Sequence, residues 1–290
     1  MSLTDGIFLG TSSFTAPGWL GSFYPRGMKP ADRLAFYAES FDTVEIDSTF
    51  YGTPLRQTVI EWALKTPENF IFAAKVPQII THEKVLRDCN SELESLLDIM
   101  SILGDKLGPM VFQFPYFSHG AFNRADAFFI RLRAFLPKLP SAYKFAIEIR
   151  NKIWLTAEFG DLLRDHHVAL VLADRPNAPR PNELFDKFDP ITTDWTYIRW
   201  LGDRKGLEAI TTKFDRIVVD RKEDMRSWVD ACFQIKKRGI LIYAYANNHY
   251  SGHAPATIEQ FRRLWYASGL PKLERDRGMK AQASLFDDPR

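Results

Sequence analysis

Short apolar segments alternate with amphipathic segments along most of the chain. Eight of the short segments have the length and composition of buried strands, and they span residues 7–10, 43–47, 70–76, 110–115, 144–150, 168–173, 195–200 and 240–246. Apolar residues recur at helical spacing over residues 30–40, 56–66, 91–103, 124–135, 156–165, 223–237 and 255–268. Parallel strands need helical crossovers, and buried ones read as nearly continuous apolar runs. The pattern therefore predicts an α/β fold, a single (β/α)8 TIM-type barrel over residues 1–269.

The remaining segments favour one barrel rather than another α/β arrangement. A doubly wound open sheet is the alternative fold, but no Gly-x-Gly-x-x-Gly turn follows any of the predicted strands. The Pro-rich segment that follows Asp174-Arg175 and runs through Asp189 predicts a loop rather than a linker between domains. Residues 270–290 have too few apolar side chains to fold alone, which predicts a flexible C-terminal tail.

Composition and charge narrow the class of protein. Of the 290 residues, 46% are hydrophobic and 26% are charged, which is typical of a soluble globular protein. The formal net charge of +2 argues against a broad nucleic-acid-binding surface, although it leaves room for a local basic pocket. The sequence contains neither an apolar run long enough to cross a membrane nor a secretory signal. We therefore expect a cytoplasmic protein without a membrane partner.

Polar side chains recur where the predicted strands end. Because side chains alternate across a strand, Glu45 and Asp47 share one face of their segment, and Glu148 and Arg150 share one face of theirs. The active sites of TIM barrels lie at the carboxyl ends of the strands. The candidate site residues at these ends, or in the loops that follow them, are Thr11, Glu45, Asp47, Lys75, Thr81, His82, Gln113, Glu148, Arg150, Asp174, Arg199, Asn247, Asn248 and His249.

The charged candidates point to the chemistry of the site. Lys75, Arg150 and Arg199 are candidates for anion binding, since a guanidinium binds phosphate or carboxylate through a planar fork. Glu45 and Glu148 are candidates for proton transfer. This set predicts an anionic, phosphate-bearing small molecule or a nucleic-acid fragment at the barrel mouth, and an acid/base enzyme of the hydrolase or the isomerase/lyase type. Two alternatives stay open: intramolecular ion pairs that neutralise the acids, and a binding module without catalysis.

A divalent metal is the weaker hypothesis for this site. His82 and His249 could join the acids around zinc or a hard cation, but no two histidines form a local chelating motif, since His249 and His253 are four apart in a predicted loop rather than a helix. The sequence identifies no cofactor, and we assign no metal ligands.

Several of the candidates stand in motifs of a known family. The segments Gly10-Thr11-Ser12 and Val44 to Tyr51 resemble those of the YecE-like family, a domain of unknown function (DUF72). Further matches are Phe72 to Lys75, Thr81-His82, Gln113-Phe114-Pro115, Glu148-x-Arg150 and Asn247-Asn248-His249. The resemblance covers residues 7–268 and implies a TIM-type barrel without an established activity. Asp47 stands where the resemblance leads us to expect Asn, and Leu201 where it leads us to expect His.

The tail carries a motif of its own. Gln282, Leu285 and Phe286 are similar to the short peptide through which bacterial proteins bind the DNA sliding clamp, in which a Gln and a Leu-Phe pair fill pockets. A flexible segment suits docking by a few anchors, although two apolar residues could also fold back on the barrel. Binding to the clamp would recruit the barrel to DNA replication or repair.

Overall fold

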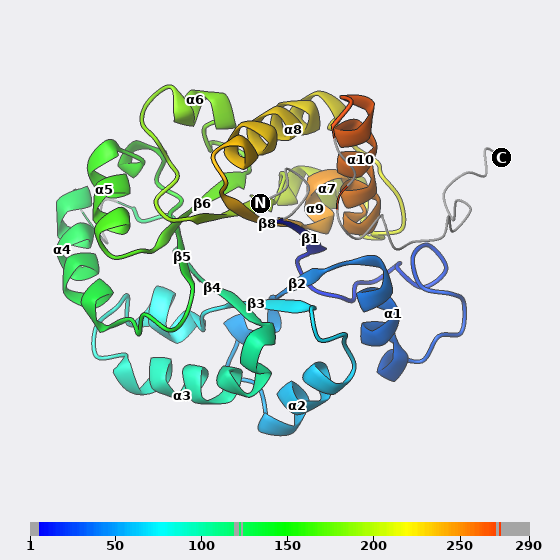
Figure 1. The fold of residues 1–290 in the computed structure, drawn as a ribbon, viewed down its shortest axis with the longest axis horizontal. Helices are drawn as coiled ribbons and strands as arrows, with labels where there is room; N and C mark the ends of the chain where they lie inside the picture. The colour runs from blue at the N-terminus through cyan, green and yellow to red at the C-terminus, as the bar shows by residue number, and fades with distance from the viewer. Residues whose placement is uncertain (1–5, 119–121, 123, 271–272, 274–290) are drawn as a thin grey trace.

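The computed structural model describes residues 6–118, 122, 124–270 and 273. Over this part of the chain, eight parallel strands form one sheet in the order β1-β8-β7-β6-β5-β4-β3-β2. The strands are β1 (Ile7–Thr11), β2 (Thr43–Ile46), β3 (Ile71–Lys75), β4 (Leu107–Gln113), β5 (Phe145–Glu148), β6 (Ala169–Asp174), β7 (Trp195–Trp200) and β8 (Leu241–Ala246). A parallel bridge between Ser12 and Glu45 joins β1 to β2, so the sheet curls into a barrel (Figure 1). The predicted (β/α)8 barrel is confirmed.

Helices surround the barrel and connect its strands (Figure 1). The longer helices are α1 (Arg33–Ser40), α2 (Arg56–Leu64), α3 (Asn90–Met100), α4 (Ala125–Phe135), α5 (Ala157–Asp165), α8 (Lys222–Lys237) and α10 (Ala254–Ala267). Three shorter helices lie in the segments after β6, β7 and β8, and they are α6 (Pro181–Phe185), α7 (Arg204–Ile210) and α9 (Asn248–Ser251).

The structure corrects some of the predicted boundaries. The Pro-rich segment after Arg175, predicted as a loop through Asp189, contains α6, and a π-helical turn occupies Ile79–Glu83 in another predicted loop. Elements this short make one or two turns, so they carry no apolar periodicity that a sequence could reveal. The strand predicted to reach Arg150 ends at Glu148, and Arg150 therefore lies in the loop after β5.

Alternation along the strands divides their side chains between two apolar layers. Outward-facing residues such as Val44, Ile147 and Ile198 belong to the large core between the sheet and the helices. The inward-facing residues form a smaller cluster inside the barrel, which consists of Ala73, Val111, Ala146, Ala169, Val171, Trp195, Tyr197, Tyr243 and Tyr245. This inner cluster fills the barrel below the point where the strands end in charged residues.

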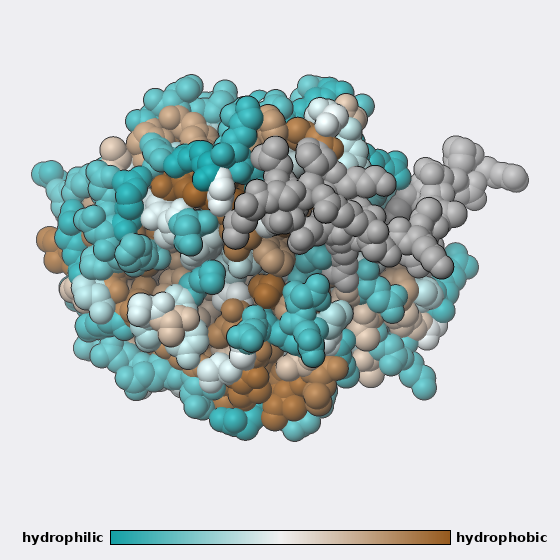
Figure 2. Space-filling view, in the orientation of Figure 1, coloured by the Kyte–Doolittle hydropathy of each residue, from teal (hydrophilic) through white to brown (hydrophobic). Residues whose placement is uncertain are grey.

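The surface and the chain ends add little that bears on the site. Figure 2 shows one face of the molecule, which is largely hydrophilic, with an apolar area over α2 at its lower edge. None of the helices in the described ranges is long and apolar enough to cross a membrane. Leu270 and Leu273, at the start of the predicted tail, pack against the core. The predicted clamp-binding residues Gln282, Leu285 and Phe286 lie outside the described residues.

Candidate functional site

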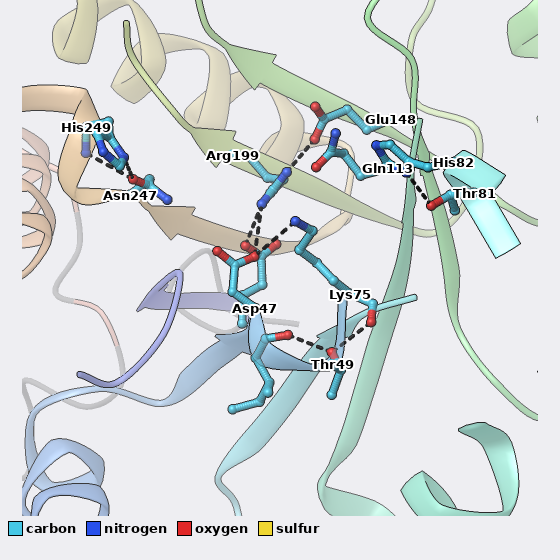
Figure 3. A network of polar contacts seen from close by, with 12 residues as sticks. Asp47, Thr49, Lys75, Thr81, His82, Gln113, Glu148, Arg199, Asn247 and His249 are labelled. Carbon is cyan, nitrogen blue, oxygen red and sulfur yellow. Dashed lines mark hydrogen bonds and ion pairs between the residues drawn. The ribbon is translucent and has the colours of Figure 1, made fainter. Parts of the chain in front are cut away.

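A buried arginine links two acids at the top of the barrel interior. Arg199 on β7 donates to Glu148 Oε2 over 2.6 Å and to Glu45 Oε1 over 2.8 Å. The three residues are at most 2% exposed. Figure 3 shows the guanidinium of Arg199 between Glu148 on one side and the β2 strand end on the other. The sequence had left ion pairing open as an alternative, and the structure shows that both acids are ion-paired.

Strand register explains why these side chains meet. Arg199 lies inward because it alternates with Ile198 and Trp200, which face the helices. Glu148 ends β5 directly beside Gln113 at the end of β4. Glu45 stands on β2, across the barrel from β7, so the Glu45–Arg199 pair spans the barrel interior.

Both carboxylate oxygens of Glu45 have hydrogen-bond partners inside the barrel. Its Oε2 atom accepts a 2.7 Å hydrogen bond from the Tyr197 hydroxyl, while Oε1 accepts from Arg199. Burial alone would raise the pKa of Glu45, but the charge of Arg199 and the hydrogen bonds from Arg199 and Tyr197 hold this pKa below its ordinary value. Glu45 is therefore a stable carboxylate. Sequence reasoning missed Tyr197, although its alternation with Ile198 indicated that it points inward.

Glu148 keeps one oxygen without a hydrogen bond. Its Oε1 atom is buried and lacks a hydrogen-bond partner among the described residues, and the Nε atom of Arg150 lies 4.0 Å away. The Nε atom of Arg199 is likewise buried without a partner in that part of the chain. Buried polar atoms are rarely left unpaired in native proteins, so these two atoms mark a place where a ligand or water would complete the bonding.

Lys75 and Asp47 form the side of the site nearest β2. The Nζ atom of Lys75 lies 3.4 Å from the Oδ1 atom of Asp47 and 4.1 Å from the centre of the Phe50 ring. Asp47 also lies 3.8 Å from Arg199. The Asp47 side chain is 36% exposed, but its Oδ1 atom is buried and has no hydrogen-bond partner among the described residues.

Thr81 and His82 come from the π-helical turn after β3. The Thr81 hydroxyl and His82 Nδ1 are hydrogen-bonded over 2.8 Å, as Figure 3 shows, and the His82 ring packs edge-on against Phe50. Burial, together with the positive charges of Arg150 and Lys75, lowers the pKa of His82. The protonated form of His82 is thus disfavoured, and its pKa depends on the cations of the site.

A cavity of about 410 Å³ opens above these residues. Its lining consists of Asp47, Lys75, Gln113, Arg150, Arg175, Pro176, Arg199, Leu201, Gly202, Asp203, Arg204, Lys205, Asn247 and His249. We call it the mouth cavity. It brings together seven of the predicted site residues, and Glu148 lies beneath it, bonded to Arg199. Leu201, the position where the family resemblance led us to expect His, faces this cavity.

Sequence reasoning missed three cations of the mouth cavity. Arg175 directly follows β6, next to the chosen Asp174, and could have been found by extending the search by one residue. Arg204 and Lys205 begin α7, whose existence the sequence did not reveal. Four cations, Lys75, Arg150, Arg175 and Lys205, exceed the two acids that line the cavity, Asp47 and Asp203. Arg199 and Arg204 are left out of this balance because Glu45 and Glu148 neutralise Arg199, and Arg204 pairs with Glu208 over 2.8 Å.

Four of the predicted residues hold the loops around the mouth, and two of them, Asn247 and His249, also line the mouth cavity. Asn247 caps α9 by accepting from the backbone N–H of His249, whose ring lies within 3.1 Å of Glu208. Asn248 Oδ1 accepts from Trp19 Nε1 and from the backbone of the α10 start. Asp174 accepts from the Trp228 indole and from the hydroxyl of Tyr250.

Thr11 is the last residue of β1, and it bonds to α1 rather than lining the mouth cavity. It is fully buried and shares a 2.8 Å hydrogen bond with the hydroxyl of Tyr37. Within the described ranges, no group of three or more His, Cys, Asp or Glu side chains is arranged to hold a metal ion.

The sequence is similar to a family and to curated proteins. The family described as "Protein of unknown function DUF72" matches residues 8–278. The UPF0759 protein YecE of Escherichia coli K12 is 28% identical over 145 residues, a match that covers 50% of this chain and 48% of YecE. The UPF0759 protein YunF of Bacillus subtilis 168 is 27% identical over 146 residues. The chain thus spans about half the length of the curated relatives it matches.

The fold is similar to solved structures. A DUF72 family protein from Thermotoga maritima superposes with a TM-score of 0.69 at 26% identity, covering 90% of this chain and 99% of that one. A D-psicose 3-epimerase superposes with a TM-score of 0.51 at 12% identity, and this likeness shows the fold alone.

Proposed function

The chain belongs to the DUF72 family of unknown function, and from its own site we propose that it binds a phosphate-bearing small molecule in the mouth cavity and acts on it by acid/base catalysis. One observation carries this proposal. Cations outnumber acids around the mouth cavity, and the buried atoms Arg199 Nε, at the cavity lining, and Glu148 Oε1, beneath that lining, lack partners in the part of the chain that the structure describes.

The cations favour an anion over a neutral ligand. Arg150 has a carboxylate only at 4.0 Å, and its side chain is 42% exposed, so its guanidinium is available for a ligand. Within the described ranges, Arg175 donates only to the backbone carbonyls of Ile149 and Pro176. A phosphate group offers several acceptor oxygens and can satisfy such forked donors through two parallel charge-assisted hydrogen bonds. A cavity of about 410 Å³ lies within the range of roughly 300–1,000 Å³ that small-molecule sites occupy.

The two acids have different roles in this proposal. Glu45 uses both oxygens on Arg199 and Tyr197, so it holds Arg199 in place rather than exchanging a proton. Glu148 bonds Arg199 through Oε2 and keeps Oε1 for a substrate at the cavity floor. We therefore assign proton transfer to Glu148 and a positioning role to Glu45, with hydrolysis and isomerisation or elimination as the reaction classes.

Calorimetric titration with inorganic phosphate tests the binding half of the proposal. Arg150→Ala should weaken binding by about tenfold or more, because a hydrogen bond to a charged group contributes about 1.5–3 kcal/mol. Arg164→Ala is the matched control, since the Arg164 side chain is also 42% exposed but pairs with Asp161 on α5. Equal affinities in the wild type and the Arg150 variant would overturn the anion site. A thermal-shift series with phosphosugars, nucleotides and short single-stranded DNA then identifies the ligand class.

The second candidate function is a binding module without catalysis that the tail recruits to DNA replication or repair. The feature that favours it is the motif Gln282, Leu285 and Phe286 in the sequence. A synthetic peptide of residues 278–290, titrated into a bacterial sliding clamp, should bind, and its Phe286→Ala version should not. Equal heats from the two peptides would remove this candidate.

A further inference from the structure

A second cavity lies beside the mouth, beneath the Pro-rich segment after β6. It measures about 190 Å³ and includes Arg175, Arg180 and Arg221 in its lining, with Asp224 and Trp228 from α8. Arg175, Pro176 and Gly202 line both cavities, so the two hollows are adjacent. The smaller volume is below the range of roughly 300–1,000 Å³ for sites that hold a whole small molecule. It suits one end of a ligand whose other end occupies the mouth cavity.

Arg175 stands at the junction of the two cavities with its charge unpaired. Its terminal nitrogens donate to the carbonyl oxygens of Pro176 and Ile149, and its Nε atom is buried without a partner among the residues described. No carboxylate among the described residues lies within 4.0 Å of the Arg175 guanidinium. Removing a charge from water without a counter-charge is unfavourable, so this guanidinium is positioned for an anion.

The other charges of the second cavity leave it slightly basic. Arg180 and Arg221 share one acid, Asp224, at 3.1 and 3.3 Å. The second acid, Asp174, accepts from the Trp228 indole over 2.7 Å and from the Tyr250 hydroxyl over 3.1 Å, and burial raises its pKa. Three arginines thus face two acids, one of which is held by hydrogen bonds at the cavity wall.

The wall opposite α8 is stiff, which favours a preformed site. Pro176, Pro179 and Pro181 fix the backbone of the segment over the cavity, because each pyrrolidine ring locks φ. The backbone N–H of Arg180 donates to Glu183 at the start of α6, which further holds the segment. A site that is already formed loses less entropy when it binds a ligand.

We propose that this cavity is a second anion subsite, so that the molecule bound at the mouth carries two anionic groups, as a sugar bisphosphate does. One phosphate lies at Lys75 and Arg150, and the other lies at Arg180 and Arg221. Arg175 lies between the two groups and serves both. This inference rests on the proposed function, since it names the class of ligand that the mouth cavity takes.

Calorimetry with a matched pair of probes, fructose 6-phosphate and fructose 1,6-bisphosphate, tests the subsite on the full chain, with inorganic phosphate as the minimal probe. The bisphosphate should bind at least about tenfold more tightly than the monophosphate, since one additional charge-assisted contact contributes about 1.5–3 kcal/mol. Arg221→Ala and Arg180→Ala should remove this advantage, while Arg221→Lys, which keeps the charge without the fork, should keep part of it. Arg226→Ala is the control, because Arg226 lies on the same helix but pairs with Glu223 outside both cavities.

Circular dichroism first confirms that the variants are folded, and the binding data then support or overturn the second anion subsite. A bisphosphate advantage that depends on Arg180 and Arg221 supports the subsite. Three results would overturn it. The two sugar phosphates could bind with equal affinity, the advantage of the bisphosphate could survive in both alanine variants, or the binding of every phosphate probe could be unchanged in Arg221→Ala. The Arg150→Ala variant separates the two proposals, because loss of binding there without any effect at Arg221 leaves the mouth site standing and removes only the subsite.

Discussion

Glu45 and Arg199 lie 154 residues apart in the sequence and form an ion pair of 2.8 Å inside the barrel. Arg199 also reaches Glu148, so three strands, β2, β5 and β7, meet through one guanidinium. A barrel interior normally consists of apolar layers, and here the uppermost layer is replaced by charges. The arrangement places a rigid, polar floor under the mouth cavity.

Replacing Arg199 by Met should destabilise the fold by at least about 3 kcal/mol, because removing one partner of a buried ion pair leaves its acid without compensation. Urea unfolding monitored by tryptophan fluorescence measures the change. Arg133→Ala is the control, since its pair with Glu158 is about half exposed and should contribute at most about 1 kcal/mol. A loss of less than 1 kcal/mol in Arg199→Met would mean that the two acids do not depend on this guanidinium.

The barrel itself was predictable because its signal is repeated. Every strand has an apolar outward face that packs on a helix, so the alternation of short apolar segments with amphipathic ones recurs along the chain. The inward direction of Glu45 and Arg199 followed from the same alternation. Their pairing did not follow, because the partner of a side chain across a barrel depends on strand tilt and register, which local sequence does not encode.

Loop residues were harder to place than strand residues. Asp174 and Asn248 are polar groups next to strand ends, as residues of an active site often are, yet the structure uses them to hold Trp228 and Trp19. Arg175, which faces two cavities, is next to Asp174 in the chain. Which of two neighbouring loop residues points into a site depends on the turn that follows the strand, and short turns leave little trace in composition.

Asn248→Ala should lower stability rather than ligand binding. The Oδ1 atom of Asn248 accepts from Trp19 Nε1 over 3.0 Å and from Ala254 N over 2.9 Å, and both donors are buried. Leaving buried donors unpaired costs about 1–3 kcal/mol each. The urea midpoint should fall, while phosphate affinity measured on the folded protein should stay near that of the wild type. A selective loss of phosphate binding without a change in stability would place Asn248 in the site instead.

Glu148→Gln and Glu45→Gln should affect the protein in different ways. With the substrate class identified by thermal shift, Glu148→Gln should abolish turnover and spare ligand binding, because the amide keeps the shape but cannot exchange the proton. Glu45→Gln should reduce stability first, because both oxygens of Glu45 are bonded, one to Arg199 and one to Tyr197. If Glu148→Gln retains full turnover, proton transfer belongs to another group. If no turnover is found for any bound ligand, the binding-module alternative is favoured.

Binding of an anion should raise the pKa of His82. Burial and the charges of Arg150 and Lys75 hold this pKa below its ordinary value of 6.5, because they disfavour the protonated ring. An anion between these two cations supplies the opposite charge, so the protonated form becomes more favourable and the pKa moves up. Binding should therefore take up protons and become tighter as pH falls through the range between the free and the bound pKa.

Sulfate is the suitable probe for this effect, because it stays doubly charged across the pH range in which an imidazole titrates. The His82 ring signal in proton NMR spectra, assigned from its loss in His82→Gln, should titrate at a higher pH in saturating sulfate than in its absence. The same comparison in Arg150→Ala should show a smaller change, since the anion is held less firmly there. An unchanged or lowered pKa in the wild type at saturation would mean that the anion does not lie between Arg150 and Lys75, and the mouth cavity would then lose its proposed ligand.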